Sequence, residues 1–446
     1  MAAIHLRRIL PPDDTIVLLE RSGRFARGPA YAPTRAPHLL NVRAMNMSAL
    51  PDAPEHFNTW LAQQLERSPA EAEHGPAGTF ATRRLYGRYL RSLLYSEIRE
   101  YGGKVRLVAD DVLQIERTAA TYRLICSSGR VVDCDGVVLA IGNLPSQTPP
   151  DGVVFRDPWA EGTTAGLRHG APVLVVGTGL TMVDLVLDMH ASGFAGPIIA
   201  ISRRGLAPQA HAAVPAPWPG PAFSAAERVS LTALLRRVRA EVRRAAADGI
   251  DWRAVVDGLR PITAALWRGM PAAERQRFLR HLRPFWDVHR HRMAPGVAAR
   301  VDVMLGSGAL QLLRGRVTRL VANSKEAHVT LQLHGKPHPR KMRVQRLIYA
   351  TGVRPAGEHT GLVQALLSSG LARLDPQGMG LTVTEGLDVI GEDDAPVHGM
   401  WALGPIVRGT FWECVAVPDI RVQARLVAQA VSQYLRETSR SDIRVT

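Results

Sequence analysis

Hydrophobic and polar positions follow two different spacings along this chain. Apolar residues recur every three or four positions in 53–65 and 82–101, which predicts one helix in each segment. Residues 104–141 alternate apolar and polar positions between short turns, which predicts a β-meander that returns into one buried strand at 136–141. The N-terminal third of the chain therefore combines helices with strands.

The rest of the chain repeats this organisation. Residues 171–205 predict a strand, a glycine turn, a helix and a second strand, and residues 310–352 predict a second meander that runs into a strand. The same supersecondary unit thus occurs twice, ending once in "LAIG" and once in "YATG". This duplication predicts an α/β fold with two Rossmann-like dinucleotide-binding modules, each accompanied by a β-meander.

A helical insertion at about 224–300 interrupts the second module. Ser224 and Glu227 fit a capping box, and Pro271 stands at a predicted helix start. The insertion carries many Arg side chains, which we expect on solvated helix faces. The last segment, "GMWALGPIVRGTFWECVAVPDIRVQARLVAQAVSQYL", predicts a short strand, a glycine turn and a long C-terminal helix.

The first predicted strand, "TIVLLE", ends in the acidic residue Glu20 and follows an amphipathic helix. In a dinucleotide-binding unit such an acidic residue lies about twenty residues beyond the glycine turn. Only nineteen residues precede Glu20, so the first strand and glycine turn of this module should fall at or before Met1. Two explanations stay open: a coding start placed too late, or a shortened gene whose product is weak in binding its first cofactor.

Composition narrows the function classes. The formal charge is +15, but only 4 of the 55 basic residues are Lys and the Arg residues are dispersed, so nucleic-acid binding is not expected. No stretch approaches the ~20 apolar residues of a membrane span, and we expect a cytoplasmic protein. The three cysteines, Cys126, Cys134 and Cys414, form no Cys-x-x-Cys pair, which disfavours a disulfide reductase.

The strongest chemical signal is "VLVVGTGLTMVD". Gly177 permits a tight turn after a buried strand, and Gly179 lets the backbone approach a pyrophosphate at the N-terminus of the following helix. Thr181 offers a hydroxyl donor. Met182 occupies the third position, where Gly or Ala is usual, so the helix and strand should lie slightly further apart. The alternative is a purely structural strand–helix turn.

The end of the next strand indicates which dinucleotide binds. Ser202, Arg203 and Arg204 stand where an NAD site usually offers Asp or Glu to the ribose 2′-hydroxyl. Guanidinium groups suit the 2′-phosphate of NADP. We therefore expect NADP, with NAD as the alternative, because the chain has five Arg-Arg pairs and one could occur here by chance.

Eight segments together resemble a known family: "LLERSGRFARGPAY", "HLLNVRAMNMSALPDAPEHF", "RRLYGRYL", "VLVVGTGLTMVDLVLD", "SRRG", "WDVHRHRMAP", "YATGVRP" and "GTFWECVAVPDIRVQA". They look like the bacterial FAD/NAD(P)-binding proteins related to FAD-dependent urate hydroxylase and to aspartate N-monooxygenase. The resemblance runs from about Ala3 to Leu435. It implies an FAD-binding module split between 1–160 and 356–446, around an NAD(P)-binding module at 165–355.

The resemblance also implies site residues for FAD. Glu20 would bind the adenosine ribose, and a second group would lie along the cofactor: Arg27, Asn41, Arg43, Met47 and Ser48. Chain crossings close to FAD would occur at Ala140, Gly142, Thr351 and Gly352, and Gly404 would lie under the pyrophosphate or ribityl chain. Asn41 and Ser48 have the alternative role of shaping turns. Pro405 departs from the Asp that related flavoproteins often place there.

These features favour an FAD-dependent, NAD(P)H-using oxidoreductase, a monooxygenase that uses O₂ to hydroxylate a small polar molecule. Such an enzyme needs no nucleophilic side chain, since the flavin supplies the chemistry, and the sequence assigns no catalytic residue. The alternatives are a flavin dehydrogenase that passes electrons to a partner, and a non-catalytic nucleotide-binding protein or truncated remnant. His289, Arg290, His291 and Arg292 cluster in "WDVHRHR", where capping or anion binding is expected rather than a metal site.

Overall fold

The computed structural model describes residues 1–31, 38–101, 104–119, 121–142, 152–160, 162–214, 216–351 and 361–443. Its fold is mixed α/β, as expected. Residues from both ends of the chain share one hydrophobic core, and we call 1–142 with 361–443 the terminal part. Residues 152–351 are the central part, which contains a seven-stranded sheet and a helical insertion.

Parallel strands of the terminal part form two separate pairs. β1 (Thr15–Leu19) pairs with β4 (Lys104–Val108), and β8 (Val137–Leu139) pairs with β17 (Pro396–Ala402). β16 (Asp388–Ile390) continues the second group on the far edge of β17. Within the described residues, β1 and β8 each have one edge without a strand partner.

The predicted helices of the terminal part are confirmed. α1 (Ala2–Ile9) precedes β1, and α2 (His56–Leu65) and α3 (Arg83–Glu100) occupy the two segments of helical spacing. Thr82 caps α3 because its side chain accepts a hydrogen bond from Leu85 N. Short 3₁₀ turns connect these elements: η1 (Pro29–Tyr31), η2 (Ala44–Asn46) and η3 (Pro69–Glu71).

The first meander is shorter than predicted. β4 runs parallel to β1, and only β5 (Val112–Arg117), β6 (Tyr122–Cys126) and β7 (Val131–Cys134) form an antiparallel sheet. The inclusion of 104–108 in the meander was wrong because a half-buried strand alternates in the same way whichever partner it has.

The central sheet has the order β14-β13-β12-β11-β10-β15-β9. β9 (Val154–Phe155), β10 (Val173–Val176), β11 (Ile198–Ser202) and β15 (Arg346–Tyr349) are parallel, as expected for a Rossmann-like unit. β12 (Leu310–Ala322) serves two roles: its first residues pair in parallel with β11, and its last pair antiparallel with β13 (Ala327–Leu333), beside β14 (Arg340–Val344). α4 (Leu180–Ala191) and α11 (Pro295–Gly306) share one hydrophobic core with the strands of this sheet.

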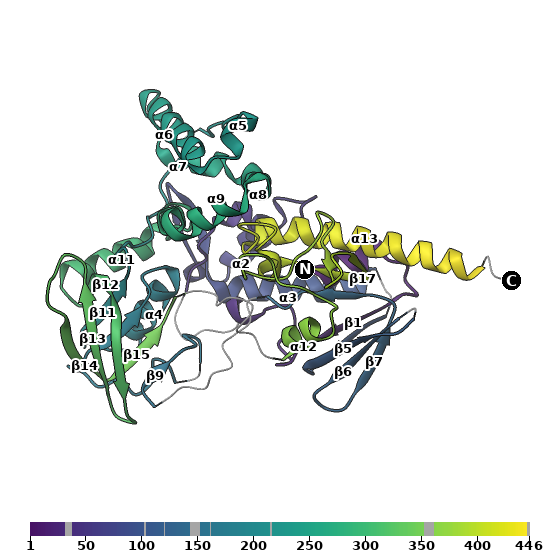
Figure 1. Ribbon diagram of the computed structural model, residues 1–446, viewed down its shortest axis with the longest axis horizontal. Helices are drawn as coiled ribbons and strands as arrows, with labels where there is room; N and C mark the ends of the chain where they lie inside the picture. Colours follow the sequence, from purple (N-terminus) through teal and green to yellow (C-terminus); the bar gives the residue numbers. More distant parts are fainter. Residues whose placement is uncertain are drawn as a thin grey trace.

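The helical insertion lies between β11 and α11, and its outermost helices project from the rest of the molecule at the top of Figure 1. Its helices are α5 (Ala225–Arg228), α6 (Leu231–Ala247), α7 (Trp252–Gly258), α8 (Arg260–Gly269), α9 (Ala272–Arg277), the π-helical turn η4 (Phe278–Leu282) and α10 (Arg283–Arg290). The Ser224–Glu227 capping box and the helix start at Pro271 are confirmed.

A hairpin of the terminal part packs into the core of the central part. It consists of β2 (Ala72–Gly75) and β3 (Gly78–Ala81), and its residues Ala77 and Phe80 are buried among those of the central core. Leu39 joins the same cluster. The two parts therefore share apolar packing as well as polar contacts.

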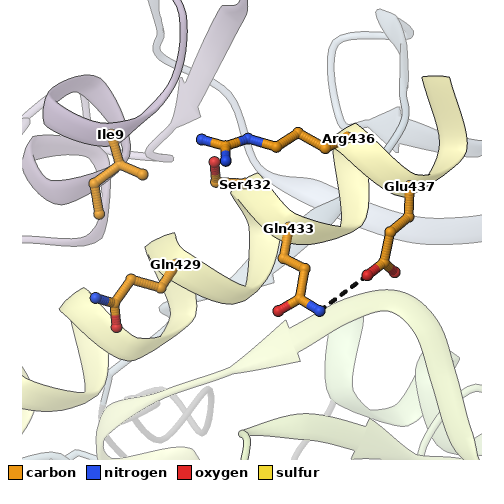
Figure 2. A pocket seen from close by; sticks show the side chains of 6 residues that line it. All are labelled: Ile9, Gln429, Ser432, Gln433, Arg436 and Glu437. Carbon is orange, nitrogen blue, oxygen red and sulfur yellow. Dashed lines mark hydrogen bonds between the residues drawn. The ribbon is translucent and has the colours of Figure 1, made fainter. Parts of the chain in front are cut away.

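The chain returns to the terminal part through α12 (Leu362–Ser368), and ends in η6 (Gly404–Val407) and the long helix α13 (Val417–Ile443). α13 lies beside α1, and Figure 2 shows a pocket between them that is lined by Ile9, Gln429, Ser432, Gln433, Arg436 and Glu437. None of the predicted cofactor-binding residues lines this pocket. Among the described helices, none is both long and apolar enough to span a bilayer.

Candidate nucleotide-binding sites

The glycine turn between β10 and α4 leaves space at a helix N-terminus. Gly177 has φ +119°, and a Cβ atom there would lie 2.2 Å from Ala350 O at the end of β15, so glycine is required by the strand packing. Gly179 is the N-cap of α4, and a Cβ atom there would meet nothing within 4 Å. The backbone is thus open to a ligand where the helix presents its unpaired N–H groups.

Two of the neighbouring side chains are used in protein contacts, and one has a hydroxyl that is free to bind a ligand. Met182 is fully buried in the central core, which explains the departure from Gly or Ala at this position. The Thr178 hydroxyl donates to Leu206 O at 2.5 Å and lies 2.9 Å from Ser202 Oγ. Thr181 is half-buried, and its hydroxyl makes no hydrogen bond with the described part of the chain.

The strand end after β11 carries two arginines with different surroundings. Arg203 is exposed and forms no ion pair with any described residue, whereas the Arg204 guanidinium lies 5.7 Å from the centre of the Phe285 ring. Ser202 Oγ accepts a hydrogen bond from Gly205 N at 3.0 Å and so shapes the turn that holds both arginines. Arg203 is therefore the group best placed to meet an anion.

Glu20 lies at the carboxyl end of β1, as predicted. Its Oε2 accepts hydrogen bonds from Ser22 N and Arg24 N, each at 2.9 Å, and from the Ser22 hydroxyl at 2.7 Å. No hydrogen bond to Oε1 is made by the described residues. The carboxylate is thus fixed by its own loop and still has an oxygen that could accept from a ribose hydroxyl.

The predicted residues of the loop at 38–48 are mostly committed to protein contacts. Ser48 is fully buried, and its hydroxyl donates to Ala53 O at 2.7 Å, which is a turn-shaping contact. Met47 is buried beside it. The carbonyl of Asn41 and the guanidinium of Arg43 both bind residues of the central part, as described further below. A cofactor contact for these four residues remains a prediction.

The remaining predicted positions follow strand ends, except Arg27, which lies in the loop between β1 and η1. Ala140 and Thr351 are exposed, and Arg27 and Gly142 are half-exposed. A Cβ atom on Gly142, which has φ +65°, would meet nothing within 4 Å. Gly352 lies outside the described residues. The carboxyl ends of β8 and β15 are therefore accessible to a ligand.

Gly404 begins the turn that leads to α13. Its φ is +78°, its N–H donates to Gln423 Oε1 at 2.8 Å, and its carbonyl accepts a hydrogen bond from Cys414 Sγ at 3.1 Å. Burial raises the pKa of the Cys414 thiol to about 12, so the thiol remains protonated and acts as a donor. Pro405 follows as the second residue of η6.

Comparison with known proteins places this geometry in a fold family. Residues 1–144 match the model of a family described as FAD-NAD(P)-binding, and no curated protein matches the sequence. L-lysine 6-monooxygenase from Pseudomonas syringae shares 15% identity over 97% of this chain and 96% of its own, with a TM-score of 0.64. Ornithine hydroxylase from Pseudomonas aeruginosa shares 15% identity over 97% of both chains, with a TM-score of 0.62.

A third structure, ornithine N-hydroxylase from Kutzneria sp. 744 with reduced FAD, NADP⁺ and L-ornithine, shares 13% identity over 97% of this chain and 96% of its own, with a TM-score of 0.60. This chain has the FAD/NAD(P)-binding flavoprotein fold. The two glycine turns lie in different parts of this fold, Gly177 in the central part and Gly404 in the terminal part.

A buried ionic cluster next to the Gly404 turn was not predicted from the sequence. Glu413 is 7% exposed and accepts a hydrogen bond from Trp286 Nε1 at 2.8 Å, and it pairs with Arg290 and His291 at 3.1 and 3.3 Å. Burial alone would raise the pKa of Glu413, but the contacts with His291, Arg290 and Trp286 lower it to about 2. The basic segment at the end of α10 thus binds a carboxylate of the protein. Glu413 lies 123 residues after Arg290, so spacing in the sequence could not identify it as the partner.

The other members of the "WDVHRHR" segment also have protein partners. His289 Nδ1 lies 2.7 Å from Phe285 O, and Arg292 pairs with Asp257 of α7. Within the described ranges, no three His, Cys, Asp or Glu side chains gather as metal ligands would. The segment therefore connects the helical insertion to neighbouring elements through polar contacts.

Proposed function

We propose that this protein is an FAD-dependent, NADPH-using monooxygenase that hydroxylates the nitrogen of a small polar amine. The proposal rests on the flavoprotein fold, on the family match over residues 1–144, and on the named relatives, which act on lysine or ornithine. The absence of an assigned catalytic side chain in the sequence agrees with chemistry carried by a cofactor.

The FAD module in this proposal comprises 1–160 and 356–446, and the NADP module comprises 165–355. Glu20 would accept hydrogen bonds from the adenosine ribose through its Oε1 oxygen, and the Gly404 turn would approach the other end of FAD. The positive φ of Gly404 and the free oxygen of Glu20 fit these roles.

NADPH would lie against the N-terminus of α4. The open backbone at Gly179 fits a pyrophosphate, and Thr181 can donate a hydrogen bond to it. Arg203 would pair with the 2′-phosphate, because its guanidinium is exposed and has no carboxylate partner among the described residues. The observation that carries the proposal is this open glycine turn beside an unpaired arginine.

The flavin supplies the redox chemistry. In the overall reaction NADPH, a proton and O₂ are consumed, one oxygen atom enters an N–H bond of the substrate, and the other leaves as water while NADPH becomes NADP⁺. The protein's own residues hold the two nucleotides so that their reactive rings meet, and they exclude water from the meeting point. A cytoplasmic location is part of the proposal, since NADPH and a reducible flavin would be available there.

The test is the stoichiometry of NADPH oxidation with added FAD. Lysine, ornithine and a diamine are offered separately, and NADPH consumed, hydrogen peroxide released and hydroxylamine formed are measured together. One hydroxylamine per NADPH with little peroxide supports the proposal. NADPH oxidation that requires an added electron acceptor and forms no hydroxylated product would favour a flavin dehydrogenase. Binding of both nucleotides without any oxidation would favour a non-catalytic protein.

A further inference from the structure

A single side chain of the terminal part reaches three segments that are far apart in sequence. Arg43 Nε donates to Ala77 O at 2.6 Å, in the turn of the β2–β3 hairpin. Its Nη2 donates to Ala212 O at 2.9 Å in the central part, and its Nη1 lies 3.8 Å from Asp257 Oδ2 of α7. All three nitrogens of this guanidinium therefore face acceptors, each on a different segment.

The hairpin is shaped to admit this arginine. Gly78 has φ +109°, and a Cβ atom on it would lie 3.2 Å from Arg43 Cδ. Any side chain at 78 would be strained and would crowd the arginine stem. Ala77 and Phe80 of the same hairpin are buried in the central core, so the carbonyl that Arg43 binds is itself fixed against the central part.

His211 makes the matching contact in the opposite direction. Its ring belongs to the central part, and Nε2 lies 3.0 Å from Asn41 O, two residues before Arg43. Burial, then the nearby Arg292, lower the pKa of His211 to about 3, so the ring is neutral and Nε2–H can donate to this carbonyl. The ring packs against Phe80 with centroids 5.2 Å apart.

The segment that carries His211 is held on its other side by the helical insertion. His211 N donates to Met293 O at 2.8 Å, and Arg253 Nε donates to Ala210 O at 2.8 Å. Arg292, only 1% exposed, pairs with Asp257, the carboxylate that also faces Arg43. The central segment that binds the loop at 41–43 is therefore itself held by hydrogen bonds to the helical insertion.

We propose that Arg43 and His211 are positioning residues for hydride transfer, which fix the loop at 41–43 relative to the central part. This inference rests on the proposed function, in which the central part holds NADPH, and on the prediction from the sequence that the loop at 41–43 borders FAD. The two side chains form one junction, because they hold neighbouring residues of the same loop on the same central segment at 211–212. No large rotation between the two parts is compatible with both contacts.

The junction matters because transfer between two rings is sensitive to their separation. A displacement of about 1 Å can cost about a hundredfold in rate even when both ligands stay bound. Contacts between parts of a chain otherwise resemble transient interfaces and permit relative motion. Loss of the junction should therefore lower the rate of transfer far more than the affinity for either nucleotide.

The first experiment measures anaerobic reduction of the FAD-loaded protein by NADPH in a stopped-flow instrument. Arg43→Gln and His211→Phe should lower the limiting rate of flavin reduction by at least about tenfold, while the Kd for NADP⁺ and the FAD content change less than about threefold. His211→Gln keeps an N–H donor and should retain most of the rate. Reduction of each variant by dithionite should be unchanged.

Arg300→Gln is the matched control. Arg300 also links the two parts, through an ion pair of 2.8 Å with Glu73, but both side chains are about two-fifths exposed. This variant should be reduced at the wild-type rate. Wild-type rates in Arg43→Gln and His211→Phe would overturn the inference. A wild-type protein that holds both nucleotides and is never reduced by NADPH would instead contradict the proposed function.

A second experiment needs no cofactor. Hydrogen exchange of the cofactor-free protein should show faster exchange in 38–48 and 209–212 for Arg43→Gln than for the wild type, and no such change for Arg300→Gln. Unchanged protection in Arg43→Gln would overturn the junction whatever reaction the protein catalyses. Faster exchange with a silent flavin would retain the junction and reject only its role in hydride transfer.

Discussion

Arg260 of α8 and Asp419 of α13 form a two-point ion pair: Nη2 lies 2.7 Å from Oδ2, and Nε lies 3.3 Å from Oδ1. Both side chains are about one-quarter exposed. The pair joins the start of a helix in the insertion to the first turn of the last helix, 159 residues later. Trp267 of α8 strengthens the same connection, because its Nε1 donates to Gly409 O at 2.7 Å.

We expect Arg260→Ala to destabilise the protein by about 1–3 kcal/mol, since a charged bidentate pair that is partly shielded from water is lost and Asp419 is left without this partner. The measurement is the midpoint of urea unfolding. Arg123→Ala is the control, because Arg123 and Asp133 form a pair of 2.9 Å that is about half exposed. That variant should change stability by no more than about 0.5 kcal/mol. Equal losses in the two variants would show that burial of the Arg260 pair contributes nothing.

Substitution by alanine should lower stability at Gly177 and should lower NADP⁺ affinity, without a loss of stability, at Gly179. Gly177→Ala puts a methyl group against Ala350 O at a positive φ, so we expect a loss of at least about 2 kcal/mol of stability. Gly179→Ala adds its methyl group in open space at φ −84° and should leave the unfolding temperature unchanged.

The second variant should nevertheless bind NADP⁺ at least about tenfold more weakly, because the added methyl group lies where a pyrophosphate would approach the backbone. Calorimetric titration of each variant with NADP⁺ checks this. If Gly179→Ala bound NADP⁺ as tightly as the wild type, the turn would be a structural strand–helix connection without a nucleotide.

The fold class, the main helices and the glycine turn could be predicted because each depends on local sequence. Val173–Val176 form a continuous apolar run and are the strand β10 with the same bounds, and Ser224 with Glu227 form the expected capping box. The strand with which a given strand pairs could not be predicted from local sequence. Residues 104–108 alternate like the meander that follows them, yet they pair in parallel with β1, which is about 90 residues earlier.

The partners of Arg43 and Glu413 were also not predictable, because they lie far away in the sequence. The position of Arg43 along FAD stays a prediction, but nothing in the sequence indicates that its guanidinium binds the carbonyls of Ala77 and Ala212. A backbone carbonyl has no sequence signature, because every residue carries one. Glu413 likewise gives no local indication that Arg290 and His291 are its partners. Long-range pairs of this kind are set by how the elements pack.

Arg203 should determine the choice of nicotinamide nucleotide. Arg203→Ala is expected to weaken NADPH binding by about tenfold, through loss of a charge-assisted bond to the 2′-phosphate, and to leave NADH binding unchanged. Fluorescence titrations with both nucleotides measure this. Arg316→Ala, at an exposed position on β12, should change neither affinity. A wild-type preference for NADH, or an equal loss for both nucleotides in Arg203→Ala, would contradict the assignment.

His211 should make the folded protein sensitive to mild acid. The pKa of His211 is lowered from 6.5 to about 3. Burial is the largest cause, followed by the charge of Arg292; Arg43 and Arg253 act in the same direction, and the hydrogen bond to the Asn41 carbonyl acts against them. The unfolded chain therefore takes up a proton at this residue near pH 6.5 and the folded protein does not. The corresponding stability is complete above about pH 6.5 and is lost progressively as the pH falls towards 3.

Urea unfolding of the wild type and of His211→Gln, at pH values from about 8 to about 5, measures this effect. The wild type should lose more stability over this range than the variant, whose amide does not titrate. His5, whose pKa burial lowers to about 4, should contribute a similar dependence to both proteins over this range and therefore leave their difference unchanged. Exposed His190→Gln is the control and should keep the wild-type slope. An identical slope in His211→Gln would mean that the ring is protonated in the folded state, and the hydrogen bond to Asn41 would then hold a charged group at the junction.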